Sequence, residues 1–99
     1  MAISNFTDKE AAKLFNGQFS RKMPRHIHRR ALRRLTQLNG AAGLEDLKLP
    51  PSNRLEQLQG DRKDQFSIRI NQQYRLCFIW KNGNAHNVEI VDYHKAGKN

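Results

Sequence analysis

The chain has 99 residues, of which 37% are hydrophobic and 27% charged, and its formal net charge is +9. This size predicts one small domain over residues 1–99, and the charge favours nucleic acid, an acidic membrane surface or an acidic protein as partner. No apolar run approaches the ~20 residues of a membrane span, the N-terminus lacks a signal-peptide pattern, and a lone Cys77 suits a reducing compartment. We therefore expect a cytoplasmic protein with no membrane partner.

The N-terminal segment predicts a short strand followed by a short helix. Ile3–Phe6 is the expected strand. Thr7-Asp8-Lys9-Glu10 then has the form of a capping box, with Phe6 placed to pack on Ala11. Asn16-Gly17 is a usual left-handed helix end, so the helix should finish there.

A second helix should begin near Pro24, which suits a first helical turn. Its apolar residues follow one another at spacings of four, four and three, which is one narrow buried stripe. These residues are Ile27, Ala31, Leu35 and Leu38. Asn39-Gly40 should end the helix.

The same segment carries seven of the eighteen basic residues of the chain and no acidic residue. The seven are Arg21, Lys22, Arg25, Arg29, Arg30, Arg33 and Arg34. Such a run is often a solvated face, but here pairing with acids four residues away cannot neutralise it. We therefore interpret it as a surface that contacts phosphates. His26 and His28 lie on different helix faces, so we expect no metal site and no cofactor.

The stretch 41–53 has turn residues and no clear period. Leu44, Leu47 and Leu49 should pack against the core, while Pro50-Pro51 blocks a continuing helix. Arg54–Leu58 reads as a strand, and Gly60–Asp64 as a polar loop.

A β-hairpin dominates the second half of the chain. Phe66–Ile70 and Tyr74–Trp80 both alternate apolar and other residues, and Asn71–Gln73 forms a short loop between them. The loop pairs Ile70 with Tyr74, Ile68 with Leu76 and Phe66 with Phe78 on the apolar face, and Arg69 with Arg75 and Ser67 with Cys77 on the other.

Two arginines directly opposite one another repel, at a cost of up to about 1 kcal/mol. The guanidinium groups of Arg69 and Arg75 can splay into solvent or pair with Glu89 or Asp92. We favour a third interpretation, in which an anion binds between them.

A turn at Asn82-Gly83 leads to a last strand, 87–91, which ends in Asp92-Tyr93-His94. The expected order is β-α-α-β-β-β-β, an α+β domain with two helices on the apolar face of a mostly antiparallel sheet. Its opposite, concave face should present Arg69, Arg75 and the Asp92–His94 strand end. Residues 95–99 should form a flexible tail.

Several segments together resemble one family in order and spacing. They are Arg54-Leu55-Glu56, Gly60-Asp61-Arg62, Phe66–Asn71, Tyr74–Phe78 and Val88–His94. These segments resemble the HigB-type toxins of the RelE/ParE toxin–antitoxin superfamily. The resemblance implies a RelE-like fold and a toxin of a type II system that cuts messenger RNA (mRNA) on the ribosome without a metal. In that reaction the 2′-hydroxyl attacks the adjacent phosphorus.

The resemblance also implies partners and roles. The partners are the ribosome, mRNA and an antitoxin with a helix-turn-helix domain, through which the complex reaches operator DNA. The catalytic residues implied are His94 as proton carrier, Asp92, Tyr93, Arg69 and Arg75. The RNA-binding residues expected are Arg54, Arg62, Lys63, Arg25, Arg29, Arg30, Arg33 and Arg34.

Glu56 and Gln59 stand where some HigB toxins carry a catalytic histidine and lysine. Glu56 is therefore a second candidate for the general base, and the sequence leaves open whether Glu56 or His94 serves.

Two other functions fit parts of the pattern. One is a ParE-like gyrase inhibitor, which binds protein and cuts nothing. The other is a nonenzymatic RNA- or ribosome-binding module that uses the basic helix alone. Neither needs the paired arginines together with Asp92-Tyr93-His94, so we favour the ribonuclease.

Overall fold

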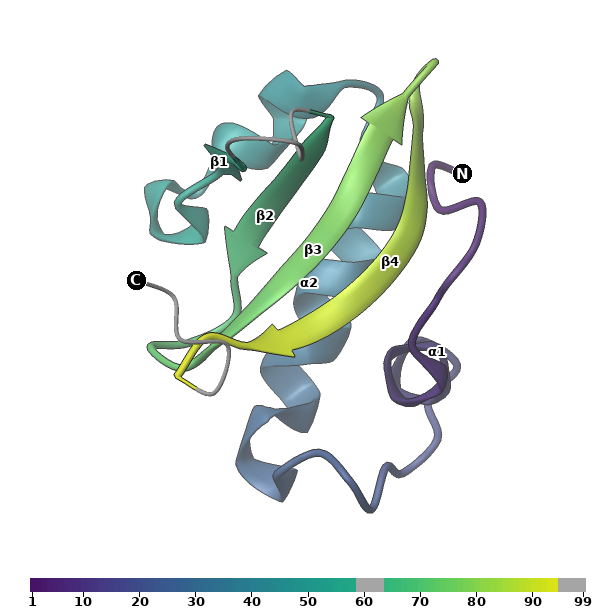
Figure 1. Cartoon of the computed structure of the whole chain (residues 1–99), viewed down its shortest axis with the longest axis vertical. Helices are drawn as coiled ribbons and strands as arrows, with labels where there is room; N and C mark the ends of the chain where they lie inside the picture. Colours follow the sequence, from purple (N-terminus) through teal and green to yellow (C-terminus); the bar gives the residue numbers. More distant parts are fainter. Residues whose placement is uncertain (59–63, 95–99) are drawn as a thin grey trace.

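The computed structural model describes residues 1–58 and 64–94, and it contains a four-stranded antiparallel sheet in the order β1-β2-β3-β4. Figure 1 shows helix α2 crossing one face of this sheet behind β3, with α1 beside β4. The helices are α1 (Lys9–Phe15) and α2 (His28–Gly40), with 3-10 turns at Arg25–Ile27, Leu44–Lys48 and Pro51–Asn53. The strands are β1 (Glu56–Gln57), β2 (Gln65–Arg69), β3 (Tyr74–Lys81) and β4 (Asn84–Asp92). The predicted loop residues 60–63 and the predicted tail 95–99 lie outside the described residues.

The central hairpin has the predicted register. Arg69 lies opposite Arg75, Ile68 opposite Leu76 and Ser67 opposite Cys77. The side chain of Asn71 builds the loop, because its Oδ1 accepts the backbone N–H groups of Gln73 and Tyr74, both at 2.8 Å. Alternation and loop length are thus sufficient to define which side chains share a face.

The turn between β3 and β4 is also the one predicted. Asn82 has φ 54° and Gly83 has φ 77°, so both central residues adopt the left-handed conformation of a type I′ turn. Asparagine and glycine tolerate this conformation best, and its twist matches that of the two long strands.

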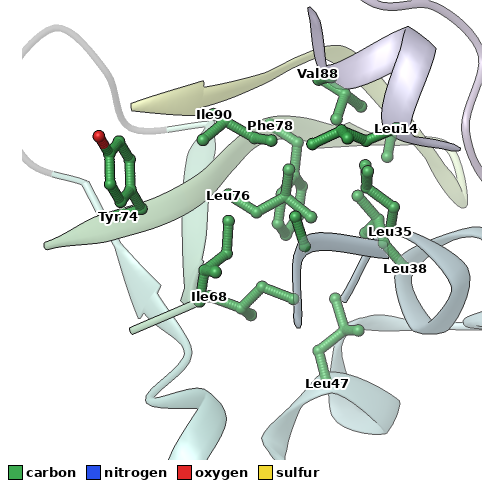
Figure 2. Close-up of a cluster of buried hydrophobic side chains, with 14 of the residues drawn as sticks. Leu14, Leu35, Leu38, Leu47, Ile68, Tyr74, Leu76, Phe78, Val88 and Ile90 are labelled. Atoms are coloured by element: carbon green, nitrogen blue, oxygen red, sulfur yellow. The ribbon is translucent and has the colours of Figure 1, made fainter. Parts of the chain in front are cut away.

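The core lies between α2 and the apolar face of the sheet (Figure 2). The predicted stripe of α2 is fully buried, and the alternating residues of β2 and β3 meet it from the sheet. The helix contributes Ala31, Leu35 and Leu38, the 3-10 turn before it contributes Ile27, and the hairpin contributes Ile68, Ile70, Leu76 and Phe78. The α+β arrangement expected from the sequence is confirmed.

Truncating Phe78 should show how strongly this core holds the fold. Phe78 is 1% exposed, so Phe78→Ala should lower the free energy of unfolding by about 3–5 kcal/mol through lost burial and a new cavity. Phe19 is 61% exposed, and Phe19→Ala should change it by about 0.5 kcal/mol or less. Urea denaturation followed by circular dichroism measures both. Equal losses in the two variants would contradict the core as described.

The first predicted strand is wrong. Ile3–Phe6 forms no strand; it makes two isolated parallel bridges to β4, Ile3 with Ala85 and Phe6 with Val88. The chain turns at Thr7 to enter α1, so pairing with β4 stops after these two bridges and no continuous ladder forms. The order of regular elements is therefore α-α-β-β-β-β.

The cap of α1 differs from the predicted capping box by one residue. Asp8 is the N-cap, and its Oδ1 accepts the N–H of Glu10 at 2.9 Å while its Oδ2 accepts the N–H of Ile90 at 3.0 Å. The hydroxyl of Thr7 instead donates to the carbonyl of Asn87 at 3.4 Å. Phe6 packs on Phe15, with ring centroids 5.7 Å apart. Contacts with β4 therefore decide the cap.

Two expectations for the connection before the hairpin need correction. Leu47 is buried as predicted, but Leu49 is 66% exposed, because hydrogen bonds from Gln37 and Asn53 hold its carbonyl rather than its side chain. The expected strand 54–58 shrinks to β1, because Arg54 has φ 46° directly after a 3-10 turn. Within residues 1–58 and 64–94, no helix has both the length and the apolar character needed to cross a membrane.

Candidate active site

Arg75 is a buried residue at the centre of the candidate site, and several contacts hold its guanidinium in place. It is only 8% exposed, although it lies on the sheet face opposite α2. Its Nε donates to Ser67 Oγ at 2.8 Å, and its Nη2 donates to the carbonyls of Arg54 and, at 3.3 Å, of Ser67. A carboxylate oxygen of Glu56 lies 3.9 Å from the same Nη2. Charged hydrogen bonds of this kind hold the guanidinium in one orientation.

Tyr93 covers this arginine. The guanidinium carbon of Arg75 lies 5.7 Å from the centroid of the Tyr93 ring, within cation–π range. The backbone N–H of Tyr93 donates to the carbonyl of Gln73 at 2.7 Å, which fixes the strand end over the hairpin loop. Burial, followed by the nearby Cys77, raises the pKa of Tyr93, while Ser67 and Arg75 act in the opposite direction. The phenol therefore stays protonated at neutral pH and can donate a hydrogen bond.

An open cavity of about 300 Å³ adjoins these two residues, and because it is the candidate site of catalysis we call it the catalytic pocket. It combines three guanidinium groups with one carboxylate, one phenol and two amides. Its lining residues are Arg54, Glu56, Arg69, Asn71, Gln72, Arg75 and Tyr93. Cations beside a carboxylate and a phenol can hold a phosphodiester and move protons around it.

The structure also shows how the facing arginines coexist. Arg75 turns toward Ser67 and Glu56, so its described ion pair is with Glu56 rather than with Glu89 or Asp92. Arg69 is half-buried and lines the pocket from the neighbouring strand. The face predicted to present Arg69 and Arg75 is thus closed at its centre, where Ser67, Arg75 and Cys77 are all buried.

The rest of the Asp92-Tyr93-His94 strand end lies beside the pocket rather than in its lining. Asp92 Oδ2 accepts the side-chain amide of Gln73 at 2.9 Å, and its Oδ1 accepts the backbone N–H of His94 at 3.0 Å. His94 is exposed. Asp92 therefore shapes the turn that carries Tyr93 and His94, and only Tyr93 of the three lines the pocket.

The expected RNA-binding residues divide among several surfaces. Arg54 lines the catalytic pocket, and Arg25 is exposed at the start of the 3-10 turn before α2. Arg29 lines a separate hollow with Leu14 and Phe19. Three arginines of α2, namely Arg30, Arg33 and Arg34, line a groove beside the end of β2. Arg62 and Lys63 lie outside the described residues.

Several parts of the pocket were not predicted as site residues from the sequence. The Ser67 hydroxyl and the Arg54 carbonyl orient Arg75, and Asn71 and Gln72 complete the lining. The register already placed Ser67 on the face of Arg75, two residues along, and this was a usable signal. The contact with the Arg54 carbonyl could not be predicted, because every residue carries a backbone carbonyl. Within residues 1–58 and 64–94, no group of three or more metal-ligating side chains gathers.

Both tyrosines of the chain should titrate above the ordinary range. Burial, with the charge of Asp92 for Tyr74 and the Cys77 neighbourhood for Tyr93, raises the pKa of both phenols. At pH ~10 an unfolded tyrosine is half ionised, so the folded protein should show less phenolate absorbance than the urea-unfolded protein. Because the folded state retains these protons longer, its stability should fall as pH rises beyond ~10. Identical titration curves for folded and unfolded protein would contradict this burial.

Comparisons with known proteins identify the family. The family described as "RelE-like toxin of type II toxin-antitoxin system HigB" matches residues 4–94. Toxin HigB-1 of Vibrio cholerae serotype O1 (strain ATCC 39315 / El Tor Inaba N16961) is 44% identical over 75 residues, which are 76% of this chain and 78% of that protein. An "Uncharacterized protein" of Haemophilus influenzae (strain ATCC 51907 / DSM 11121 / KW20 / Rd) is 32% identical over 74 residues, 75% of this chain and 73% of that protein.

A solved structure shares the fold. The crystal structure of YafQ from E. coli strain BL21(DE3) matches with a TM-score of 0.57 at 15% identity, covering 96% of this chain and 93% of that chain. The RelE-like fold expected from the sequence is thereby confirmed. Because the family match spans residues 4–94, the chain belongs to the HigB-like, RelE-like toxins of type II toxin–antitoxin systems.

Proposed function

We propose that this toxin is an endoribonuclease that cuts mRNA on the ribosome, without a metal, in the catalytic pocket. The observation that carries the proposal is the gathering of Arg54, Arg69 and Arg75 around Glu56 and Tyr93. A phosphodiester that reacts with its own 2′-hydroxyl needs a base, an acid and cations for the charge that builds on phosphorus. The pocket supplies the cations and a carboxylate within one cavity, and the strand end beside it supplies His94.

The cations have distinct parts in this proposal. Arg75 is buried and held through Nε and Nη2, so it acts as a preorganised charge at a fixed place. Arg69 and Arg54 are more accessible and close on the phosphate from either side. A fixed guanidinium needs no reorganisation as the phosphorane forms, which is the condition under which electrostatic stabilisation is strongest.

Proton transfer is divided between Glu56 and His94. Glu56 is the one carboxylate among the lining residues, and its half-exposed side chain can reach a 2′-hydroxyl placed at the pocket mouth. His94 directly follows Tyr93 and is exposed, and histidine is the side chain best able to exchange a proton near neutral pH, which suits it to protonate the departing 5′ oxygen. Tyr93, held protonated, donates a hydrogen bond to a phosphate oxygen.

The family implies an antitoxin as protein partner. We propose that this antitoxin carries a helix-turn-helix domain and that the pair binds its operator DNA through it. A chain of net charge +9 suits both an acidic antitoxin surface and the RNA of the ribosome. We place its action in the cytoplasm, where translating ribosomes are found.

Primer extension on an mRNA in a purified translation system tests this function. Wild-type toxin with ribosomes should produce cuts within codons, and the same mRNA without ribosomes should remain intact. Loss of protein synthesis with a full-length message would instead indicate a binding module. Inhibition of gyrase supercoiling by the same preparation would indicate a ParE-like inhibitor.

A further inference from the structure

A second groove lies beside the catalytic pocket, between α2 and the end of β2, and we call it the α2 groove. Its volume is about 360 Å³. Four of its lining residues are arginines, and none is acidic. The full set of lining residues is Arg30, Arg33, Arg34, Ser52, Arg69, Ile70 and Asn71.

Helix periodicity explains why three arginines meet here. Residues three and four apart share a helix face, so Arg30 lies next to both Arg33 and Arg34. Arg29 is also four residues from Arg33, but it lines the separate hollow with Leu14 and Phe19. Like charges at this spacing cost about 0.2–0.5 kcal/mol per pair. Among residues 1–58 and 64–94, the ion pairs are Lys13–Glu10 and Arg75–Glu56, so no acid there relieves the repulsion.

Arg34 has a structural task that the other two lack. Its Nε donates to the carbonyl of Arg69 at 2.8 Å, which ties α2 to the end of β2. Burial, then the charges of Arg30 and Arg33, lower the pKa of Arg34. Arg30 and Arg33 are exposed, so their guanidinium groups are available to an incoming anion.

The two cavities are adjacent because they share Arg69 and Asn71. The Oδ1 of Asn71 is occupied by the hairpin loop, which leaves its amide nitrogen as the donor that can face a ligand. One extended polyanion can therefore occupy both cavities without leaving the surface between them.

We propose that the α2 groove binds a second phosphate of the RNA strand whose scissile phosphate enters the catalytic pocket. This inference rests on the proposed function and adds to it a subsite that sets where the strand is held. Arg30 and Arg33 grip the flanking phosphate, Arg69 and Asn71 stand between the two phosphates, and Arg34 holds the helix in place. An acidic protein segment could fill both cavities only if its carboxylates happened to have the right spacing. An RNA backbone carries one phosphate per nucleotide at a regular spacing, so RNA is the favoured ligand.

A nuclear magnetic resonance titration tests the subsite without ribosomes or cleavage. The probe is a 2′-O-methylated RNA tetranucleotide, which cannot react, in an all-phosphodiester form and in forms with one neutral methylphosphonate linkage. For wild type, the form whose neutral linkage replaces the flanking phosphate in the α2 groove should bind about tenfold more weakly, because charged hydrogen bonds are lost. The amides of Ser52, Ile70 and Asn71 should shift with the unmodified probe.

Arg30→Ala/Arg33→Ala should lower the affinity for the unmodified probe by a similar factor, and the neutral linkage should then cost nothing further. Lys9→Ala/Lys81→Ala removes the same charge from exposed positions outside both cavities and should keep the tenfold effect of the neutral linkage.

An equal tenfold effect in the α2 double variant would overturn the subsite, and so would an absence of shifts at Ser52, Ile70 and Asn71. Intact mRNA in the translation assay would overturn the proposed cleavage alone, because this titration does not depend on it. If the probe left these amides unmoved while an acidic antitoxin shifted them, the α2 groove would be a protein contact and the RNA subsite would be rejected.

Discussion

Arg75→Ala should lower ribosome-dependent mRNA cleavage by at least about 10²-fold, the usual cost of removing one preorganised donor. The guanidinium is buried and bound to Ser67 and to the Arg54 carbonyl, so its charge is held at one fixed place in the pocket. Arg75→Lys keeps a charge but loses the planar fork that bonds both partners, so its activity should lie between wild type and the alanine variant. Single-turnover cleavage on programmed ribosomes measures all three.

A loss of stability could imitate this effect, and Ser67→Ala separates the two explanations. Removing Arg75 leaves buried polar partners unpaired, at a cost of about 1–3 kcal/mol. Ser67→Ala also breaks the bond to Nε but leaves the guanidinium beside the pocket. It should therefore lower stability while retaining most of the cleavage rate. If Ser67→Ala lost as much activity as Arg75→Ala at matched folded fractions, the charge of Arg75 would not be the cause.

Glu56→Gln and His94→Ala should each slow cleavage by about 10²–10⁴-fold, because each removes one proton transfer. A substrate with sulfur in place of the 5′ bridging oxygen distinguishes the two roles, since a thiolate leaves without being protonated. The sulfur substrate should restore cleavage by His94→Ala toward the wild-type rate, while Glu56→Gln stays slow because the 2′-hydroxyl still needs a base. Burst-phase cleavage of both substrates by both variants measures this.

Glu45→Gln is the matched control, because it neutralises another exposed carboxylate, in the 3-10 turn Leu44–Lys48. It should leave both substrates at the wild-type rate. If the sulfur substrate restored Glu56→Gln and not His94→Ala, the assignment of base and acid would have to be exchanged.

The sequence was sufficient for the parts of the fold that depend on periodicity. The alternation of Phe66–Ile70 and Tyr74–Trp80 predicted the hairpin register, and the spacing of the α2 stripe predicted its buried face. It failed where tertiary contacts compete with local preference. Asp8 caps α1 because it also reaches Ile90 on β4, and Leu49 stays exposed because its carbonyl is the bonded group.

The candidate site followed the same division. The strand register predicted that Arg69 and Arg75 share one face of the sheet. Their different environments depend on the position of the backbone that follows the 3-10 turn Pro51–Asn53, which the register does not predict. Arg54 has a left-handed backbone conformation and its carbonyl accepts a hydrogen bond from Arg75. Every residue has a backbone carbonyl, so the residue type at position 54 does not predict this contact. Likewise, the bond from Arg34 to the Arg69 carbonyl, which joins the basic helix to the pocket edge, spans 35 residues of sequence.

Cleavage of an mRNA with a single 2′-deoxynucleotide shows whether the 2′-hydroxyl is the nucleophile. The deoxynucleotide is placed at the nucleotide 5′ to the bond that wild-type toxin cuts, on programmed ribosomes. We expect the all-ribose message to be cut there and its upstream fragment to end in a 2′,3′-cyclic phosphate, while the substituted message stays whole at that bond. Equal cutting of both messages would exclude attack by the 2′-hydroxyl, and an all-ribose message that survives would exclude cleavage altogether.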